Sequence, residues 1–78
     1  MPEEPTDAEI VETAADAAER TVFSRYDRSA VRDIDVTVSY DDGQLAVDVY
    51  LNAKGGDPRT VADDAALAAR GAVDALLE

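Results

Sequence analysis

The stretch DIDVTVSYDDGQLAVDVYL, residues 33–51, decides the fold of this 78-residue chain. Apolar and polar residues alternate strictly on both sides of its centre, a pattern typical of strands with one buried face. The dipeptide Asp42-Gly43 at the centre favours a two-residue turn of type I′. The stretch therefore predicts an antiparallel β-hairpin.

The turn also predicts how the two strands pair. A two-residue turn places Tyr40 opposite Leu45. Counting outward, apolar residues meet apolar residues in three more pairs: Val38 with Val47, Val36 with Val49, and Ile34 with Leu51. A slip of one residue would move the apolar set of one strand to the opposite face. We therefore expect one apolar face for the core and one polar face, which bears Tyr50.

A helix is predicted before the hairpin, over residues 7–23. Thr6 is a good N-cap, Glu9 stands at the capping-box spacing, and Asp7 suits the positive end of the helix dipole. The apolar residues recur with helical spacing and are mostly alanine, which permits close approach of a neighbour. They are Ile10, Val11, Ala14, Ala15, Ala17, Ala18 and Val22.

A second helix is predicted after the hairpin, over residues 58–77. Gly55-Gly56 ends the strand, Asp57 is suited to cap the helix, and Pro58 is favoured at the first helical position. The apolar face of this helix consists of Val61, Ala62, Ala65, Ala68, Ala69, Ala72, Val73 and Leu76. The opposite face bears Arg59, Asp63, Arg70 and Asp74.

The expected architecture is a single α+β domain over residues 1–78, in the order α-β-β-α, with the first five residues loose. Both helices pack on one face of the hairpin, and both sheet edges stay open. A two-stranded sheet is marginal alone, and open edges invite pairing with another chain. The chain has no Cys, so disulfides cannot support its small core. The sequence therefore predicts a protein partner, either a second copy or a related subunit.

Four residues are candidates for the partner contact. Leu67 and Leu77 fall on the polar side of the second helix, near Arg70, and Tyr50 lies on the outer face of the hairpin. Two leucines in an otherwise regular polar face favour a packing interface. Isolated exposed leucines are also common in proteins without any such role, and this alternative stays open.

The charge of the chain is strongly negative, with eighteen acidic and seven basic residues and a net charge of −11. Asp outnumbers Glu, Arg outnumbers Lys, and the acids are dispersed, as is typical of proteins from salt-loving organisms. We expect a cytoplasmic protein, because the sequence has no membrane span and no signal peptide. The absence of His and Cys removes the commonest catalytic sets, so we expect no enzyme activity, cofactor or metal.

The positive charge is concentrated in the stretch RTVFSRYDRSAVRD, residues 20–33, which holds Arg20, Arg25, Arg28 and Arg32. Two interpretations are open. The arginines can stabilise the end of the first helix and pair with nearby acids. Alternatively, they can contact the phosphates of a nucleic acid or an acidic partner, with Phe23 and Tyr26 available for stacking.

The order of elements resembles a known family. The hairpin DIDVTVSYDDGQLAVDVYLNA and the helix GGDPRTVADDAALAARGAVDALL, with its entry Asp57-Pro58-Arg59, resemble a family of small haloarchaeal and other archaeal proteins. That family is similar to the small dimerising subunit of KEOPS, the complex that makes threonylcarbamoyl adenosine in tRNA. The KEOPS subunit has a strand before its first helix, whereas the first element predicted here is a helix. The resemblance implies a sheet edge left free for a partner subunit.

The resemblance implies a non-catalytic accessory subunit of KEOPS. Such a subunit would pair with the small dimerising subunit and, through it, with the large catalytic subunit. Leu67 and Leu77 would then contact a partner, and the arginines would contact tRNA or a partner. Two alternatives remain: a free-standing homodimeric module that binds RNA through the four arginines, and a small enzyme that relies on carboxylates or on a site completed by another chain.

Overall fold

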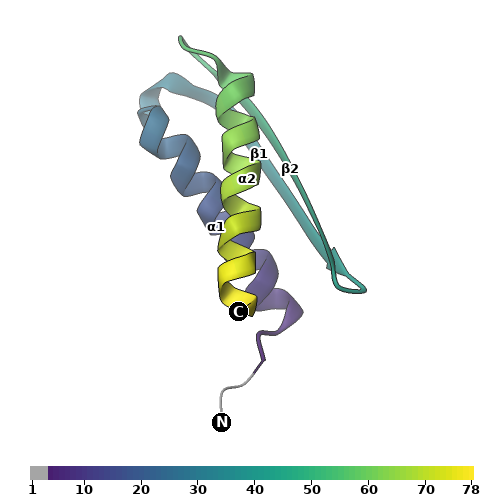
Figure 1. Cartoon of the computed structure of the whole chain (residues 1–78). Coiled ribbons are helices and arrows are strands. Elements are labelled where there is room, and N and C mark those ends of the chain that lie inside the picture. Colours follow the sequence, from purple (N-terminus) through teal and green to yellow (C-terminus); the bar gives the residue numbers. More distant parts are fainter. Residues whose placement is uncertain (1–3) are drawn as a thin grey trace.

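The structure, a computed structural model, describes residues 4–78 and contains two helices packed against a β-hairpin (Figure 1). Helix α1 spans Asp7–Arg25 and helix α2 spans Pro58–Leu77. Strands β1 (Val31–Asp41) and β2 (Gln44–Ala53) form the hairpin, and a short 3-10 turn, η1 (Arg28–Ala30), precedes β1. The predicted α-β-β-α order is therefore confirmed.

The hairpin has the predicted turn and register. Asp42 and Gly43 both have positive φ, 51° and 76°, as a type I′ turn requires. Tyr40 pairs with Leu45, and the three other apolar pairs follow as predicted. Each strand continues two residues beyond the predicted stretch, and a register shift lies between Val31 and Asp33.

The core lies mainly between the two helices. Its buried members are Ile10, Ala14, Ala18 and Val22 of α1, Leu51 of β2, and Val61, Ala62, Ala65, Ala69 and Val73 of α2. Half of these residues are alanine, and their small side chains let the two helices pack closely. Helix α1 starts as predicted, with the Thr6 hydroxyl accepting the N–H of Glu9, but it ends at Arg25, two residues later than predicted.

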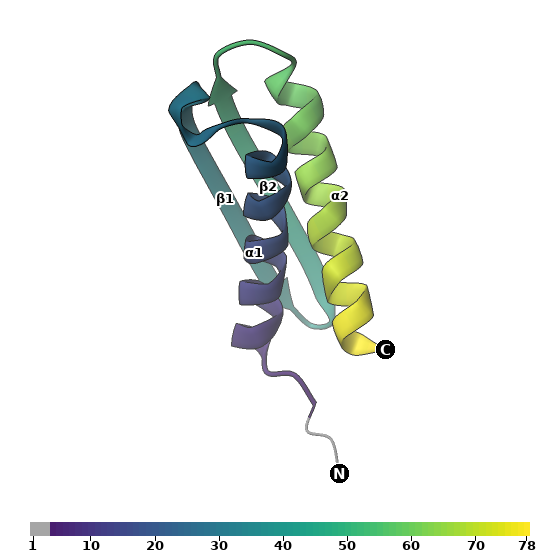
Figure 2. The same cartoon turned by 90° about the vertical axis from the view of Figure 1, so that its left-hand side faces the viewer.

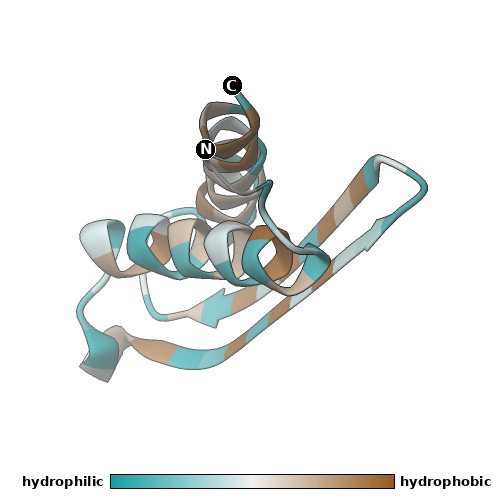
Figure 3. Cartoon of the chain, turned by 90° about the horizontal axis from the view of Figure 1, so that it is seen from below, coloured by the Kyte–Doolittle hydropathy of each residue, from teal (hydrophilic) through white to brown (hydrophobic). Residues whose placement is uncertain are grey.

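The apolar face of the hairpin is only partly covered. In Figure 2 both helices lie on the same side of the two strands, and in Figure 3 the turn of the hairpin reaches beyond the helices. Leu51 is the one buried residue of the hairpin, whereas Val36, Val38, Val47 and Val49 are half-buried. The sheet has two strands, so one edge of β1 and one edge of β2 lack a neighbouring strand within residues 4–78.

The molecule is elongated, with principal extents of 46, 21 and 16 Å. One end holds the C-terminus of α1, η1, the start of β1, the end of β2 and the start of α2 (Figure 1). Two long-range hydrogen bonds join the loops at this end. The N–H of Lys54 donates to the carbonyl of Ala30 at 2.8 Å, and the Tyr26 hydroxyl donates to the carbonyl of Gly55 at 2.7 Å.

The opposite end holds the hairpin turn, the start of α1 and the end of α2. The segment predicted to be loose, residues 1–5, lies partly outside the described residues. Within the described part, Pro5 is half-buried and lines a hollow with Tyr40 and Leu77. No helix in the described part of the chain is long and apolar enough to cross a membrane.

Candidate nucleic-acid and partner interfaces

Positive charge gathers at one end of the molecule. Residues 25–33 and 53–60, which form the end where the loops meet, contain five cations and three carboxylates and so carry a formal charge of +2. The five cations are Arg25, Arg28, Arg32, Lys54 and Arg59. The rest of the chain contains two arginines and fifteen carboxylates and carries −13. We call this end of the molecule the basic end.

The structure separates the four predicted arginines into two groups. Arg20 lies on α1 away from the basic end and pairs with Asp16, one turn earlier, at 2.9 Å. Arg25 pairs with Asp64 of α2 at 3.2 Å and so links the two helices. Both side chains are at least half-exposed, so each pair contributes little stability. The first interpretation of the arginines, surface ion pairing near the helix end, describes these two.

Arg28 and Arg32 have different surroundings. The guanidinium of Arg28 stacks over the ring of Phe23, 4.6 Å from its centroid. Arg28, Arg32 and Phe23 line an open hollow of about 330 Å³ whose other walls are Val31, Asp33 and Ile34. The expectation that these arginines pair with nearby acids is wrong for both, because neither has a carboxylate within 4 Å among the described residues. Two unpaired guanidinium groups beside an aromatic ring are a chemistry that suits a phosphate and a stacked base.

Lys54 and Arg59 belong to the basic end, although the sequence pattern did not assign them to it. They lie more than twenty residues after Arg32 in the sequence, but the antiparallel hairpin brings the end of β2 back beside the start of β1, where Val31 pairs with Ala53. The pairing register of the hairpin is the only feature of the sequence that indicates this proximity. A prediction that carried the register to its outer end would have placed Lys54 beside the arginines.

The candidate partner residues lie on two separate surfaces. Leu67 and Leu77 of α2 are 66% and 47% exposed, and Arg70 between them is also exposed. Tyr50 of β2 is 55% exposed and lines a different hollow, which it shares with Arg59 and Asp63. The structure therefore brings Leu67, Arg70 and Leu77 together on one helix and leaves Tyr50 apart from them.

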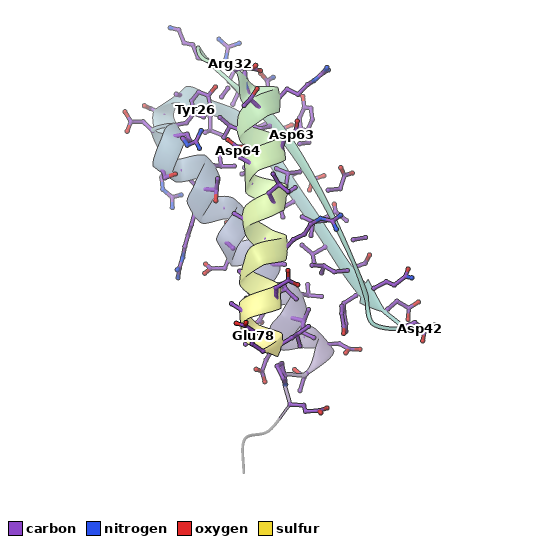
Figure 4. The ribbon with its side chains drawn as sticks, viewed as in Figure 1. Tyr26, Arg32, Asp42, Asp63, Asp64 and Glu78 are labelled. Atoms are coloured by element: carbon purple, nitrogen blue, oxygen red, sulfur yellow. The ribbon has the colours of Figure 1, made fainter. Side chains whose placement is uncertain are left out.

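Two pairs of adjacent aspartates, Asp41-Asp42 and Asp63-Asp64, lie on different elements, the hairpin and α2. Asp63 and Asp64 project from different sides of α2, and Asp42 lies at the tip of the hairpin (Figure 4). Across residues 4–78, no three carboxylates come close enough together to hold a metal ion.

Asp57 has a structural task at the start of α2. Its carboxylate accepts the Thr60 hydroxyl at 2.8 Å and the Thr60 N–H at 3.4 Å. These hydrogen bonds lower the pKa of the Asp57 carboxyl because they favour its charged form. Asp57 is therefore the N-cap that the sequence predicts.

Comparison with known proteins shows a clear similarity to a haloarchaeal protein. The chain is 56% identical over 77 residues to an uncharacterized protein of the haloarchaeon Natronomonas pharaonis, and the match covers 97% of this chain and 93% of that protein. No family model matches the chain, and no solved structure matches it. At this identity and coverage, the chain belongs to the same family of short haloarchaeal proteins, whose function is unknown.

Proposed function

We propose that this member of the haloarchaeal family is a non-catalytic interaction subunit that pairs through its hairpin with another protein chain. The observation that carries the proposal is the incomplete sheet. Strands of 11 and 10 residues form a two-stranded sheet, and the apolar side chains on its inner face are half-buried, apart from Leu51. Long open edges of this kind are a template for pairing with a further strand.

The chemistry of the open edges supports pairing with a strand. In an antiparallel ladder, alternate residues of each strand direct their N–H and C=O groups away from the neighbour. A third strand would satisfy one such row, and its side chains would extend the apolar face and pack beside those of the strand that it joins. Three or more strands with a packed face also form an independently stable sheet, which two strands seldom do.

The resemblance to KEOPS suggests which chain the partner is. We propose that the small dimerising subunit of KEOPS supplies the pairing strand and connects this chain to the large catalytic subunit. The chain would then serve the synthesis of threonylcarbamoyl adenosine in tRNA, in the cytoplasm. The positive charge of the basic end, at Arg28, Arg32 and Lys54, would assist the binding of tRNA.

The test is affinity purification of the tagged chain from a haloarchaeal host in concentrated KCl, followed by mass measurement of the intact assembly. We expect the KEOPS small subunit to co-purify with the tagged chain at a fixed stoichiometry. Val47→Asp, on the half-covered apolar face of β2, should abolish the capture, whereas its matched neighbour Ala46→Asp, on the exposed face, should retain it. Circular dichroism of both variants verifies that they fold. Recovery of the folded chain without any KEOPS component would contradict the proposal.

A second candidate is a free-standing RNA-binding module, which the five cations of the basic end favour. It predicts that the isolated chain binds RNA and that the affinity falls steeply as salt rises. Arg28→Ala, Arg32→Ala and Lys54→Ala should each weaken binding. Arg20→Ala, which removes a cation far from the basic end, should leave the affinity nearly unchanged. A chain that binds no RNA even at low salt would exclude this candidate.

A further inference from the structure

Helix α2 carries a regular exposed stripe that the core does not use. Leu67, Arg70, Asp74 and Leu77 follow one another at intervals of three, four and three residues. These intervals place all four side chains on one side of the helix, in the a and d positions of a heptad pattern. All four are exposed. We call this set the α2 stripe.

The α2 stripe is self-complementary when it is read backwards. From its N-terminal end the order is leucine, cation, anion, leucine, and from its C-terminal end it is leucine, anion, cation, leucine. In an antiparallel pair of helices, an a residue of one helix lies in the same layer as a d residue of the other. Reversal of the stripe therefore places leucine against leucine in the two outer layers and cation against anion in the two inner layers.

The two charged groups are available for such a contact. Arg70 and Asp74 are spaced for an ion pair within the helix, yet in residues 4–78 they form none, either with each other or with a different residue. Two other cations, Arg20 and Arg25, do pair with carboxylates. Arg70 and Asp74 are therefore free to form ion pairs with another helix that carries an anion and a cation in the opposite order.

The surroundings of the α2 stripe permit close approach. Figure 1 shows α2 lying in front of α1, and Figure 2 shows it at one side of the molecule. The stripe is flanked by Ala66 and Gly71, and the space at Gly71 is open, with no atom within 4 Å of an added Cβ. Small flanking residues let two helix backbones approach each other.

We propose that the α2 stripe is the contact between two copies of this chain, which pair through antiparallel α2 helices about a twofold axis near residue 72. Leu67 of each copy packs against Leu77 of the second copy, and Arg70 of each copy pairs with Asp74 of the second copy. A twofold interface requires that residue i contacts j and j contacts i, and the order of this stripe meets that requirement. The pairs lie in four layers, about 15 Å from first to last at 1.5 Å per residue.

The charge of the whole chain makes this contact dependent on salt. Each copy carries −11, so two copies repel each other at low ionic strength. At about 1 M salt the Debye length is about 3 Å, so the long-range repulsion vanishes while directly contacting groups still attract. Because only four side chains of each copy make the contact, we expect it to fall in the size class of weak and transient pairs, below about 1,200 Å² in total. The dimer should therefore form in concentrated salt and at high protein concentration.

This inference goes beyond the proposed function, because it uses α2 and leaves the hairpin free. The hairpin and the α2 stripe are different surfaces. One chain can therefore pair with another subunit through the hairpin and with a second copy through the α2 stripe at the same time. Such a complex would hold two copies of this chain around one twofold axis. Loss of either contact leaves the other intact, so the two proposals fail separately.

The test is sedimentation of the whole chain in concentrated KCl, with charge reversals in the α2 stripe. Arg70→Asp and Asp74→Arg each place like charges in two layers and should weaken the dimer by at least about tenfold. The double variant, with both substitutions in one chain, again places opposite charges in both layers, with their positions exchanged. It should recover the dimer affinity of the natural chain. An equimolar mixture of the two single variants should also recover it, because each supplies the charges that the other lacks.

Arg59→Asp is the matched control, since it reverses an exposed arginine of the same helix outside the α2 stripe. It should leave the dimer unchanged, and circular dichroism should show native helix content in every variant. A chain that stays monomeric in concentrated KCl at high protein concentration would overturn the proposal. A dimer that resists both single reversals but is lost in Val47→Asp would also overturn it, because that result locates the dimer contact at the hairpin.

Discussion

The helix pair and the hairpin bury their apolar residues to very different extents. Ala14, Ala18, Ala65 and Ala69, at the contact between α1 and α2, are completely buried. The valines of the hairpin face the same core and remain half-buried. Both regions have a regular apolar pattern, so the pattern alone does not determine burial. Each helix buries the apolar face of the other, whereas the two helices together cover only part of the apolar face of the hairpin.

The largest expected effect is at the tight helix contact. Ala65 is completely buried, so Ala65→Leu forces extra volume between α1 and α2 and should lower the free energy of unfolding by about 1–3 kcal/mol. Ala75→Leu is the matched control on the same helix, at an exposed position, and should change it by less than about 0.5 kcal/mol. Urea denaturation of the two variants measures the difference. Equal stability of both would show that the helix contact is loose.

The second prediction compares the same truncation in the two regions. Val22→Ala removes two methyl groups from a completely buried site of α1 and should cost about 2 kcal/mol. Val38→Ala, on the half-covered face of β1, should cost less than about 1 kcal/mol in the isolated chain. Urea denaturation of the isolated chain measures both. If the two costs are alike, the hairpin face is already covered, and the argument for a pairing strand fails.

The third prediction compares two glycines that have open space around them. Gly43 in the hairpin turn has a φ of +76°, so Gly43→Ala introduces backbone strain and should cost about 1 kcal/mol. Gly71 lies within α2, and Gly71→Ala should stabilise the chain by about 0.5–1 kcal/mol. Thermal unfolding at low protein concentration measures both changes. The opposite signs follow from backbone conformation alone, since neither added methyl group meets another atom.

The smallest expected effect is at Asp57, which joins the hairpin to α2. The hydrogen bonds from Thr60 lower the pKa of the Asp57 carboxyl in the folded chain. A lowered pKa stabilises the fold above the unfolded value, about 3.9, and this contribution is lost as the pH falls through the folded value. Asp57→Asn retains a capping side chain but does not titrate. The stability of the natural chain relative to this variant should therefore decrease below about pH 4.

Urea denaturation at a series of pH values measures that difference. The pH dependence common to both proteins, which comes from the other carboxylates, cancels in the comparison. A stability difference that stays constant from neutral pH to about pH 3 would show that Asp57 titrates alike in the folded and unfolded chain.

Most of the fold could be predicted from local patterns. The Asp42-Gly43 turn requires the pairing of Tyr40 with Leu45, and Thr6 and Asp57 each begin a helix where predicted. The C-terminus of α1 could not be predicted as well, because no glycine follows the last apolar turn. The incomplete burial of the hairpin face could not be predicted from the sequence either, because it depends on how far the two packed helices extend across the sheet.

The candidate interfaces were only partly predictable. The arginines Arg28 and Arg32 are neighbours along the chain, so their shared position follows from the sequence. Arg25 and Asp64 come from different helices, and their ion pair depends on how α1 packs against α2. Lys54 is brought to the basic end by the hairpin. The pairing with KEOPS and the binding of tRNA are proposals: the purification experiment tests the first, and RNA binding by the isolated chain tests the second.

The placement of the five cations at one end also determines how this protein would stand on a nucleic acid. The phosphates would attract the basic end and repel the acidic remainder of the chain. The long axis of the protein would therefore point away from the nucleic acid. The footprint would then be the cross-section, 21 by 16 Å, rather than the 46 Å length. At 3.4 Å per phosphate, 21 Å spans about six phosphates of one strand. Because five cations are available, the logarithmic salt slope on a duplex should be no steeper than about −4.5.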